Sequence, residues 1–326
     1  MTKLLTPPQV NELIDRGEIL FIAGSSEAIW QLKPGNWIAG STSYFMGSEK
    51  GLVSDQLLHV CQIPAPKNFR IQSYSVEELP RIPAHYFGNG YSLILIPGMS
   101  QAHLEFAKNV FNFPDLFAGN LVGWITGNRL EAPADQAPFV MDGRTLERFD
   151  NSAILLHVDL PNELIAKTEI VNIFEPTSTY QVEFPETSFR IESCRINGEV
   201  VNFADFLRAN KIDTRLPLIA DFSGAHINVS FNQLAERHVD LYAPVFRGVK
   251  YHFAKPVPDY AAAFAEHTRQ VSRDPVFSCN CILNYVYAEL EGKKVGPVAP
   301  MTFGEVAYIL LNQTLVNLVV EPRQTG

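Results

Sequence analysis

The 326-residue chain has ordinary globular composition, with 46% hydrophobic and 19% charged residues. Its formal net charge of −9, without any block of Lys and Arg, argues against binding to nucleic acid or to an anionic membrane surface. The apolar runs are too short to span a bilayer, the first residues do not resemble a signal peptide, and four cysteines are too few for a disulfide framework. We therefore expect a soluble, reduced, cytoplasmic protein.

The chain opens with a predicted helix over residues 6–17. Thr6 is in the N-cap position, Gln9 follows three residues later as in a capping box, and Gly17 stands just past the end. Short strand candidates follow. The strongest covers residues 91–98 (YSLILIPG), whose near-continuous apolar run is typical of a strand covered on both faces.

Two hairpins are predicted further along the chain, because Asp142-Gly143 and Asn197-Gly198 are pairs that tight turns favour. The second hairpin leads into a short helix over residues 203–210, and another helix is expected over 258–271. The pattern predicts a mixed α/β (α+β) fold with two sheet-containing lobes and helices packed on the sheets. A boundary is expected at residues 159–169, where the pattern becomes rich in hairpins.

Ser100 raises the question of catalysis. Residues 98–102 read G-M-S-Q-A, one residue away from the nucleophile elbow of serine hydrolases, and they stand between a predicted strand and a predicted helix. An elbow nucleophile needs a His base and an orienting acid, and none of the later histidines has a telling context. Since Ser is a favoured N-cap, we interpret Ser100 as a helix cap and keep a hydrolase using Ser100 as an alternative.

Cys279 and Cys281 are two positions apart and are expected on one face of a strand. Two thiols at this spacing can share a metal or supply a reactive thiolate. A closed zinc site needs four ligands, however, and Cys61 and Cys194 are isolated in the sequence. We interpret the pair as buried small hydrophobes, predict no metal and no cofactor, and keep a thiol enzyme using Cys279 as a further alternative.

The stretch Ser41-Thr42-Ser43 ends a predicted strand in a small polar turn. Its hydroxyls and backbone N–H groups suit an anion or a carboxylate, although such turns are also common without a ligand. The eight histidines form no H-x-x-x-H or H-E-x-x-H pair, and the sequence has no G-x-x-x-x-G-K-[ST] phosphate loop.

Several stretches, taken together and in order, resemble the FIST family, a sensory domain named for F-box and intracellular signal transduction proteins. The similar stretches are WIAGSTSYFMG (37–47), LILIPGMSQAHLEF (93–106), the run from LFAGNLVGWITG (116–127) to PFVMDGRTLERFDNSAILLHVDL (138–160), IESCRINGEVVNFADFL (191–207), VFSCNCILN (276–284) and MTFGEVAYILLNQTLVNLVV (301–320). The last is the most specific, through Phe303-Gly304-Glu305 and Asn312-Gln313-Thr314.

The chain also departs from the family pattern. Residues 280–282 read Asn-Cys-Ile where the family tends to have Gly-Arg-Gly, Asn120 replaces the second Gly of a GG pair, and Leu311 replaces a His. The chain thus resembles a divergent member. The resemblance implies a FIST N-terminal lobe over residues 1–163, a FIST C-terminal lobe over 164–326, and an amino-acid-like small-molecule ligand.

The resemblance and the side-chain chemistry together suggest a ligand site where the polar turn meets the C-terminal segment. The hydroxyls of the turn suit a ligand carboxylate, and Glu305 suits an ammonium group. The side-chain amides of Asn312 and Gln313 can both donate and accept hydrogen bonds. The expected ligand-binding residues are Ser41, Thr42, Ser43, Cys279, Glu305, Asn312 and Gln313. The alternative is that Glu305 and Asn312 satisfy backbone groups inside the second lobe, since buried polar side chains bond mostly to backbone or water.

The expected function is therefore that of a cytoplasmic sensory protein that binds a small molecule and signals through a protein partner. An enzyme using Ser100 or Cys279 is one alternative, and a scaffold that binds no ligand is another. Binding to nucleic acid or membrane is not expected.

Overall fold

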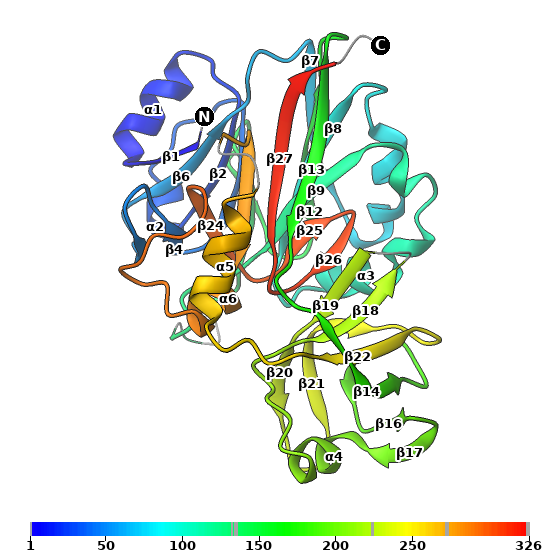
Figure 1. Ribbon diagram of the computed structural model, residues 1–326. Helices are drawn as coiled ribbons and strands as arrows, with labels where there is room; N and C mark the ends of the chain where they lie inside the picture. Colours follow the sequence, from blue (N-terminus) through cyan, green and yellow to red (C-terminus); the bar gives the residue numbers. More distant parts are fainter. Residues whose placement is uncertain (1, 132, 134–135, 223–224, 271–273, 324–326) are drawn as a thin grey trace.

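The computed structural model describes residues 2–131, 133, 136–222, 225–270 and 274–323 (Figure 1). Within these residues the strands form four six-stranded sheets and one three-stranded sheet, and short helices pack against them. The expected mixed α/β class is confirmed. None of the described helices is long and apolar enough to cross a membrane.

The first sheet is built by the N-terminal part of the chain, and its strands run in the order β1-β6-β2-β3-β10-β11. The bounds are β1 Thr2–Leu5, β2 Leu20–Gly24, β3 Trp37–Ser41, β6 Leu58–Gln62, β10 Val140–Asp142 and β11 Glu147–Phe149. Helix α1 (Pro7–Asp15) packs its apolar stripe on this sheet, and the four-residue helix α2 (Ser26–Ile29) follows β2. Strands β2 and β3 are parallel, so the segments that follow them start at the same sheet edge.

The second sheet forms the centre of the fold, in the order β26-β25-β9-β8-β12-β7. The bounds are β7 Asn68–Tyr74, β8 Gly90–Pro97, β9 Asn120–Thr126, β12 Ala153–Asp159, β25 Glu305–Ala307 and β26 Ile309–Leu311. The predicted strand at residues 91–98 is β8, which is buried from Tyr91 to Pro97 and pairs in parallel with β9. Helix α3 (Gln101–Asn109) and the 3-10 helices η1 (Val76–His85), η2 (Val110–Asn112) and η3 (Leu116–Ala118) complete this layer.

The third sheet has the order β13-β27-β23-β24-β4-β5. The bounds are β4 Tyr44–Met46, β5 Gly51–Val53, β13 Leu164–Val171, β23 Phe277–Cys281, β24 Ala299–Thr302 and β27 Leu315–Pro322. Helices α5 (Tyr260–Thr268) and α6 (Ile282–Tyr287) lie beside it and share a buried apolar cluster with it. The long antiparallel strands β13 and β27 lie side by side in the middle of Figure 1, where β27 points upward.

The remaining two sheets form the lower body in Figure 1, built from residues 176–254. One sheet has the order β17-β16-β14-β22-β18-β19 and the other the order β15-β21-β20. The bounds are β14 Pro176–Glu183, β15 Ser188–Ile191, β16 Ser193–Ile196, β17 Glu199–Asn202, β18 Leu218–Phe222, β19 Ala225–Val229, β20 Phe231–Leu234, β21 Val239–Val245 and β22 Lys250–Ala254, with α4 at Phe203–Ala209.

The two halves of the chain share sheets. Strand β4 pairs with β24, and β9 pairs with β25, so strands from before residue 163 lie next to strands from the last thirty residues. A division into residues 1–163 and 164–326 therefore does not separate the sheets. The architecture instead has a main body made from both ends of the chain and an inserted body at 176–254, because the chain returns to the main body after β22.

The predicted helix cap at Thr6 and the tight turn at Asn197-Gly198 are confirmed, whereas the hairpin at Asp142-Gly143 pairs Asp142 with Glu147 and so has a four-residue loop instead of a tight turn. Thr6 and Gln9 form a capping box at the start of α1. Asn197 and Gly198 both have positive φ angles, 50° and 92°, and connect the paired strands β16 and β17. Positive φ at two consecutive central positions is what a type I′ hairpin turn requires, and Asn-Gly adopts it with little strain.

Candidate functional site

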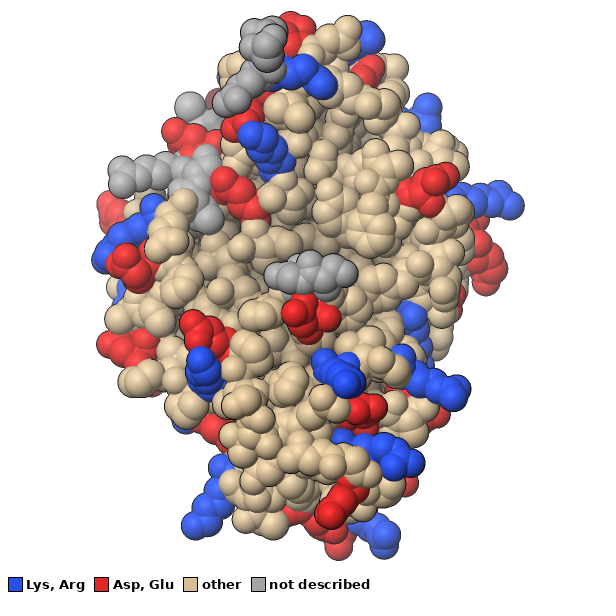
Figure 2. All heavy atoms as spheres, turned by 45° about the vertical axis from the view of Figure 1, so that its right-hand side comes forward, with Lys and Arg blue, Asp and Glu red and all other residues tan. Residues whose placement is uncertain are grey.

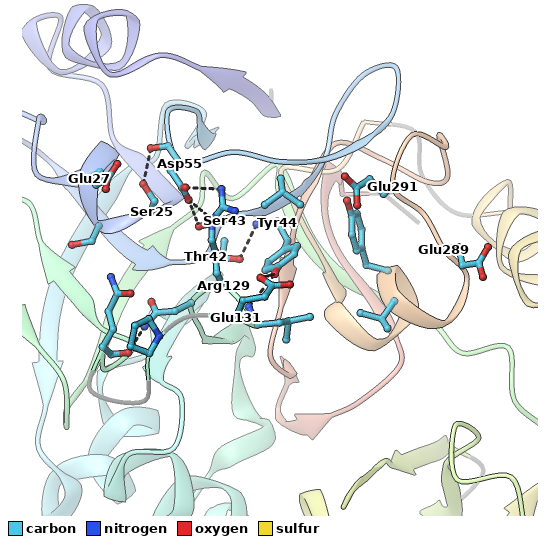
Figure 3. A pocket seen from close by; sticks show the side chains of 18 of the residues that line it. Ser25, Glu27, Thr42, Ser43, Tyr44, Asp55, Arg129, Glu131, Glu289 and Glu291 are labelled. Atoms are coloured by element: carbon cyan, nitrogen blue, oxygen red, sulfur yellow. Dashed lines mark hydrogen bonds and ion pairs between the residues drawn. The ribbon is translucent and has the colours of Figure 1, made fainter.

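A cavity of about 1020 Å³ lies where three parts of the main body meet. Its walls come from the segments that follow β2 and β3, from the segment after β9, and from α6 with the turn after it. Figure 3 shows side chains from these segments facing a common space. The volume is in the range of small-molecule sites in proteins.

Asp55 organises one wall of the cavity. Its Oδ1 accepts hydrogen bonds from Ser43 Oγ at 2.7 Å and from Arg129 Nε at 3.1 Å, and Arg129 Nη2 lies 2.6 Å from Oδ2. Burial acts to raise the pKa of Asp55, but the hydrogen bonds from Arg129 and Ser43 and the nearby positive charge outweigh it, so that the pKa is lowered. Asp55 is thus an anion at neutral pH, held in place by a two-pronged guanidinium contact.

The backbone of Asp55 is fixed as well. Ser25 Oγ donates to the Asp55 carbonyl oxygen at 2.7 Å and accepts from Ala28 N at 3.2 Å as the N-cap of α2. The segment after β2 and the segment after β5 are therefore tied together at the rim of the cavity, and the position of Asp55 is set by groups other than a ligand.

Tyr44 organises the adjoining part of the lining. Its hydroxyl accepts from Leu130 N at 3.0 Å and lies 3.4 Å from Glu131 Oε2, while its ring meets Tyr285 edge to face at 5.8 Å. Burial is the main reason that the pKa of Tyr44 is raised, so the hydroxyl keeps its proton at neutral pH. Tyr44 therefore holds the segment after β9 against the C-terminal part of the chain.

The described lining carries more negative than positive side chains. The carboxylates are Glu27, Asp55, Glu131, Glu289 and Glu291, and the cations are Arg129 and Lys293. Arg129 is engaged by Asp55, and Lys293 Nζ lies 3.9 Å from Glu289 Oε2. Among the described residues, Glu27, Glu131 and Glu291 have no cationic partner within 4.0 Å. The charge of the cavity therefore favours a cation.

The polar turn lies at this site. Ser43 Oγ bonds Asp55, and Thr42 lines the cavity while its hydroxyl donates to the Met301 carbonyl oxygen at 2.9 Å. Ser41 is buried, and its Oγ accepts from Phe139 N at 3.1 Å within the first sheet. The turn thus meets the C-terminal segment at Met301, and its hydroxyls are committed to protein acceptors and donors.

Glu305 lies in the core, apart from the cavity lining. It is fully buried, its Oε2 accepts from Thr314 Oγ1 at 2.8 Å and from Thr314 N at 3.3 Å, and its Oε1 lies 3.0 Å from Thr302 Oγ1. Burial raises the pKa of Glu305 to about 8, and the hydrogen bonds from the two threonines offset only part of that rise. Glu305 is thus mainly protonated at neutral pH.

Asn312 and Gln313 join the main body to the inserted body. Asn312 Oδ1 accepts from Ser230 N at 3.3 Å, and Gln313 Oε1 accepts from Ser230 Oγ at 2.6 Å. Gln313 Nε2 also donates to Tyr260 Oη at 3.0 Å. Both side chains are buried and bonded to protein groups, and neither lines the cavity. This placement matches the alternative in which polar side chains of the C-terminal segment form hydrogen bonds with protein groups inside the fold.

Cys279 is also remote from the cavity. It is fully buried on β23, and its Sγ lies 3.4 Å from the Gly123 carbonyl oxygen. Burial is the main cause that raises the pKa of its thiol well above the usual range, so a thiolate is disfavoured. All four cysteines are free and buried. Within the described residues no group of three or more His, Cys, Asp or Glu side chains is arranged to hold a metal ion.

Ser100 caps α3. Its Oγ accepts from His103 N at 3.1 Å and donates to the Pro97 carbonyl oxygen at 2.7 Å. The hydroxyl proton is therefore engaged by a backbone carbonyl and is not aimed at a histidine base. This geometry supports the cap interpretation rather than a nucleophile elbow.

Asp55, Arg129 and Glu131 were not expected from sequence. The sequence does contain a signal for this site, because polar residues follow the carboxyl ends of β2, β3 and β9. In the structure β2 is parallel to β3, and β8 is parallel to β9. Ligands of open α/β sheets commonly bind outside the carboxyl ends of parallel strands. Which of these ends meet one another, however, depends on how the sheets pack.

The sequence matches a family of unknown function, DUF6976, over residues 5–321. The chain belongs to this family. Comparison with curated proteins gives no match. Neither finding bears on the resemblance to FIST domains, which stays a prediction, and the family description carries no activity.

Proposed function

We propose that this protein binds a small organic cation of the di- or polyamine type in the 1020 Å³ cavity. The observation that carries the proposal is the excess of carboxylates in the lining, combined with the engagement of both lining cations by carboxylates of the protein. Alkylammonium groups placed beside Glu27, Glu131 or Glu291 would supply the missing positive charge.

The structure favours an amine over a zwitterionic amino acid. A ligand carboxylate needs donors, but the Ser43 hydroxyl already donates to Asp55 and the Thr42 hydroxyl to the Met301 carbonyl. Arg129 is held by Asp55 in a two-pronged contact. A ligand carboxylate would therefore have to displace existing bonds, whereas an ammonium group adds to the acceptors that are present.

Two aromatic rings add to this preference. Tyr44 and Tyr285 both line the cavity, in edge-to-face contact with each other. The face of a tyrosine ring attracts an alkylammonium group, and its hydrocarbon surface suits the methylene chain between two amines.

The test is calorimetric titration with putrescine and spermidine, with glutamate as the anionic comparison. We expect binding of both amines that weakens as salt is raised, and no heat of binding with glutamate. Glu131→Gln and Glu291→Gln should each weaken amine binding about two- to fivefold, the usual value of an exposed ion pair. Glu199→Gln, on β17 in the inserted body, removes an exposed carboxylate outside the cavity and serves as the matched control.

Tight binding of glutamate, or amine binding that is unchanged in both cavity variants, would contradict the proposal. Binding of none of these molecules would instead favour a scaffold without a ligand. An enzyme using Ser100 or Cys279 has no support in the geometry, because one side chain caps a helix and the other is a buried thiol.

We further propose that binding serves a sensory role in the cytoplasm, with a protein partner that receives the signal. The four free buried cysteines are compatible with a reducing compartment. On the face that Figure 2 shows, Lys and Arg are interspersed with Asp and Glu, and the described residues there form no basic patch of the kind that nucleic acid requires.

A further inference from the structure

Four polar side chains, which we call the Tyr74 chain, are joined by hydrogen bonds on the central sheet. Tyr74 Oη, at the end of β7, lies 2.8 Å from His85 Nδ1 and 2.8 Å from His157 Nε2. His157 Nδ1 on β12 lies 2.7 Å from Ser92 Oγ, on the neighbouring strand β8. The Tyr74 chain therefore leads from His85, the last residue of η1, into the middle of the central sheet.

The Tyr74 chain begins near solvent and ends in the core. His85 is half-buried, whereas Tyr74, His157 and Ser92 are each at most 1% exposed. Burial, with the positive charges of His85 and Arg70 as lesser causes, lowers the pKa of His157 to about 3. His157 therefore stays neutral and carries a single proton around neutral pH, and His85 is the member at which a proton from solvent can enter.

The hydrogen bonds of the chain can run in two directions, because the tyrosine has one hydroxyl proton and a neutral imidazole has one ring proton. In the first direction Ser92 Oγ donates to His157 Nδ1, His157 Nε2 donates to Tyr74, and Tyr74 donates to His85 Nδ1. In the second direction all three bonds are reversed. His157 then carries its proton on Nδ1 instead of Nε2.

The first direction is favoured while His85 is neutral. Each proton that lies between Ser92 and His85 then has an acceptor within the chain. In the second direction Ser92 Oγ accepts from His157, and the Ser92 proton has no other acceptor among the described residues. A buried donor that is left without a partner is costly, so the neutral protein keeps the His157 proton on Nε2.

A proton on His85 requires the second direction. Both ring nitrogens of a histidinium carry protons, so His85 Nδ1 can no longer accept from Tyr74 and has to donate to it. Tyr74 then donates to His157 Nε2, and the proton of His157 has to lie on Nδ1, facing Ser92. One proton is gained in total, on His85, and the other three members each keep one.

The charged groups around the Tyr74 chain do not compete for these bonds. Arg70 of β7 and Glu78 of η1 shift the pKa of the central tyrosine in opposite directions, and neither is hydrogen-bonded to the chain in the described structure. The ring of Tyr86 lies 6.3 Å from that of His157. Helix α3 also packs on η1, and its Glu105 accepts a hydrogen bond within that helix.

We propose that the Tyr74 chain is a pH-sensitive relay, in which uptake of a proton by His85 reverses the three hydrogen bonds and moves the proton of His157 from Nε2 to Nδ1. A change of protonation at the end of η1 is thereby transmitted to Ser92 in the central sheet. The relay is independent of amine binding, since none of its four residues lines the 1020 Å³ cavity.

The test is two-bond proton–nitrogen NMR of the full chain labelled with 15N at histidine, because this spectrum shows which ring nitrogen of each histidine is protonated. The spectra of His85→Gln and His157→Gln assign the two rings. As pH falls from 8 to 5, the range in which histidines commonly titrate, we expect His85 to become doubly protonated. With the same midpoint, the single proton of His157 should move from Nε2 to Nδ1.

Three variants test the coupling. In His85→Gln the side chain cannot titrate, so the His157 spectrum should not change with pH over this range. Tyr74→Phe interrupts the chain, so His157 should no longer follow the titration of His85. Tyr91→Phe is the matched control and should keep the wild-type coupling, because Tyr91 is a buried tyrosine of β8 whose hydroxyl has no partner among the described residues.

Several results would overturn the relay. These are a His157 proton that stays on Nε2 while His85 titrates, a His157 ring that becomes doubly protonated together with His85, and coupling that persists in Tyr74→Phe. A His85 ring that remains neutral down to pH 5 would also overturn it. If Tyr74→Phe fails to fold, the wild-type titration and its comparison with His85→Gln still decide the question.

Discussion

Arg129 reaches Asp55 across 74 positions of sequence and holds both oxygens of its carboxylate, at 3.1 Å from Nε to Oδ1 and 2.6 Å from Nη2 to Oδ2. This contact joins the segment after β9 to the segment after β5. It fixes the charge of one wall of the 1020 Å³ cavity. Among the described residues, Arg129 is the only cation in the hydrogen-bond network of that wall, and its guanidinium is already paired with Asp55.

Asp55→Asn is expected to lower the free energy of unfolding by about 0.5 to 1 kcal/mol at neutral pH, since both partners are partly exposed and the pair is screened. The pKa of Asp55 is lowered in the folded state, so its contribution to stability is present above the unfolded value of 3.8 and is lost as pH falls through the folded value. Urea unfolding of both proteins at neutral and acidic pH measures this. A stability difference that grows on acidification would contradict it.

Glu305 is expected to show the opposite dependence on pH. Its pKa rises from 4.5 to about 8 on folding, so the folded state binds the extra proton between these values and stability falls as pH rises through that window. Thr302 Oγ1 lies 3.0 Å from Glu305 Oε1 and 3.2 Å from the Asn280 carbonyl oxygen, and its single proton serves only one of them. A proton on Glu305 resolves this conflict, because Glu305 then donates to Thr302 and Thr302 donates to Asn280.

Glu305→Gln mimics the protonated side chain and should therefore change stability little below pH 4.5. As pH rises from 4.5 to about 8 the variant should become progressively more stable than the wild type, because the wild-type carboxyl must take up a proton to fold, and the difference should level off above pH 8. Chemical unfolding across this pH range measures the difference. Equal pH dependence in the two proteins would show that Glu305 does not titrate in this window.

Ser100→Ala should cost about 1 kcal/mol of stability, the usual loss for an N-cap. Ser193→Ala, at an exposed position of β16, is the control and should change stability little. A fluorophosphonate probe should leave Ser100 unlabelled, because the Oγ proton is engaged by the Pro97 carbonyl oxygen. Covalent labelling of Ser100 would restore the hydrolase alternative.

Tyr44→Phe should loosen the segment after β9 while keeping the ring contact with Tyr285. The Leu130 amide loses its acceptor, so its hydrogen exchange should become faster than in the wild type. Tyr180→Phe, whose hydroxyl bonds Asn210 in the inserted body, is the matched control. Unchanged exchange at Leu130 would show that the segment is held by other contacts.

Local features of this protein follow from the sequence alone. The capping box of Thr6 and Gln9, the cap at Ser100 and the turn at Asn197-Gly198 all depend on groups within a few residues of one another. The apolar run of β8 likewise marks a strand covered on both faces. Short-range geometry and side-chain chemistry determine these features, so they can be predicted from the sequence.

The tertiary structure decided the division into bodies and the composition of the site. Strand β24 pairs with β4 after more than 250 intervening residues, and no local pattern encodes which distant strand completes a sheet edge. Glu305 and Ser43 were both expected in one ligand site. Packing instead placed Glu305 in the core beside two threonines and Ser43 at a cavity beside Asp55. Burial sets the ionisation and partners of such groups, and burial follows from the assembled sheets.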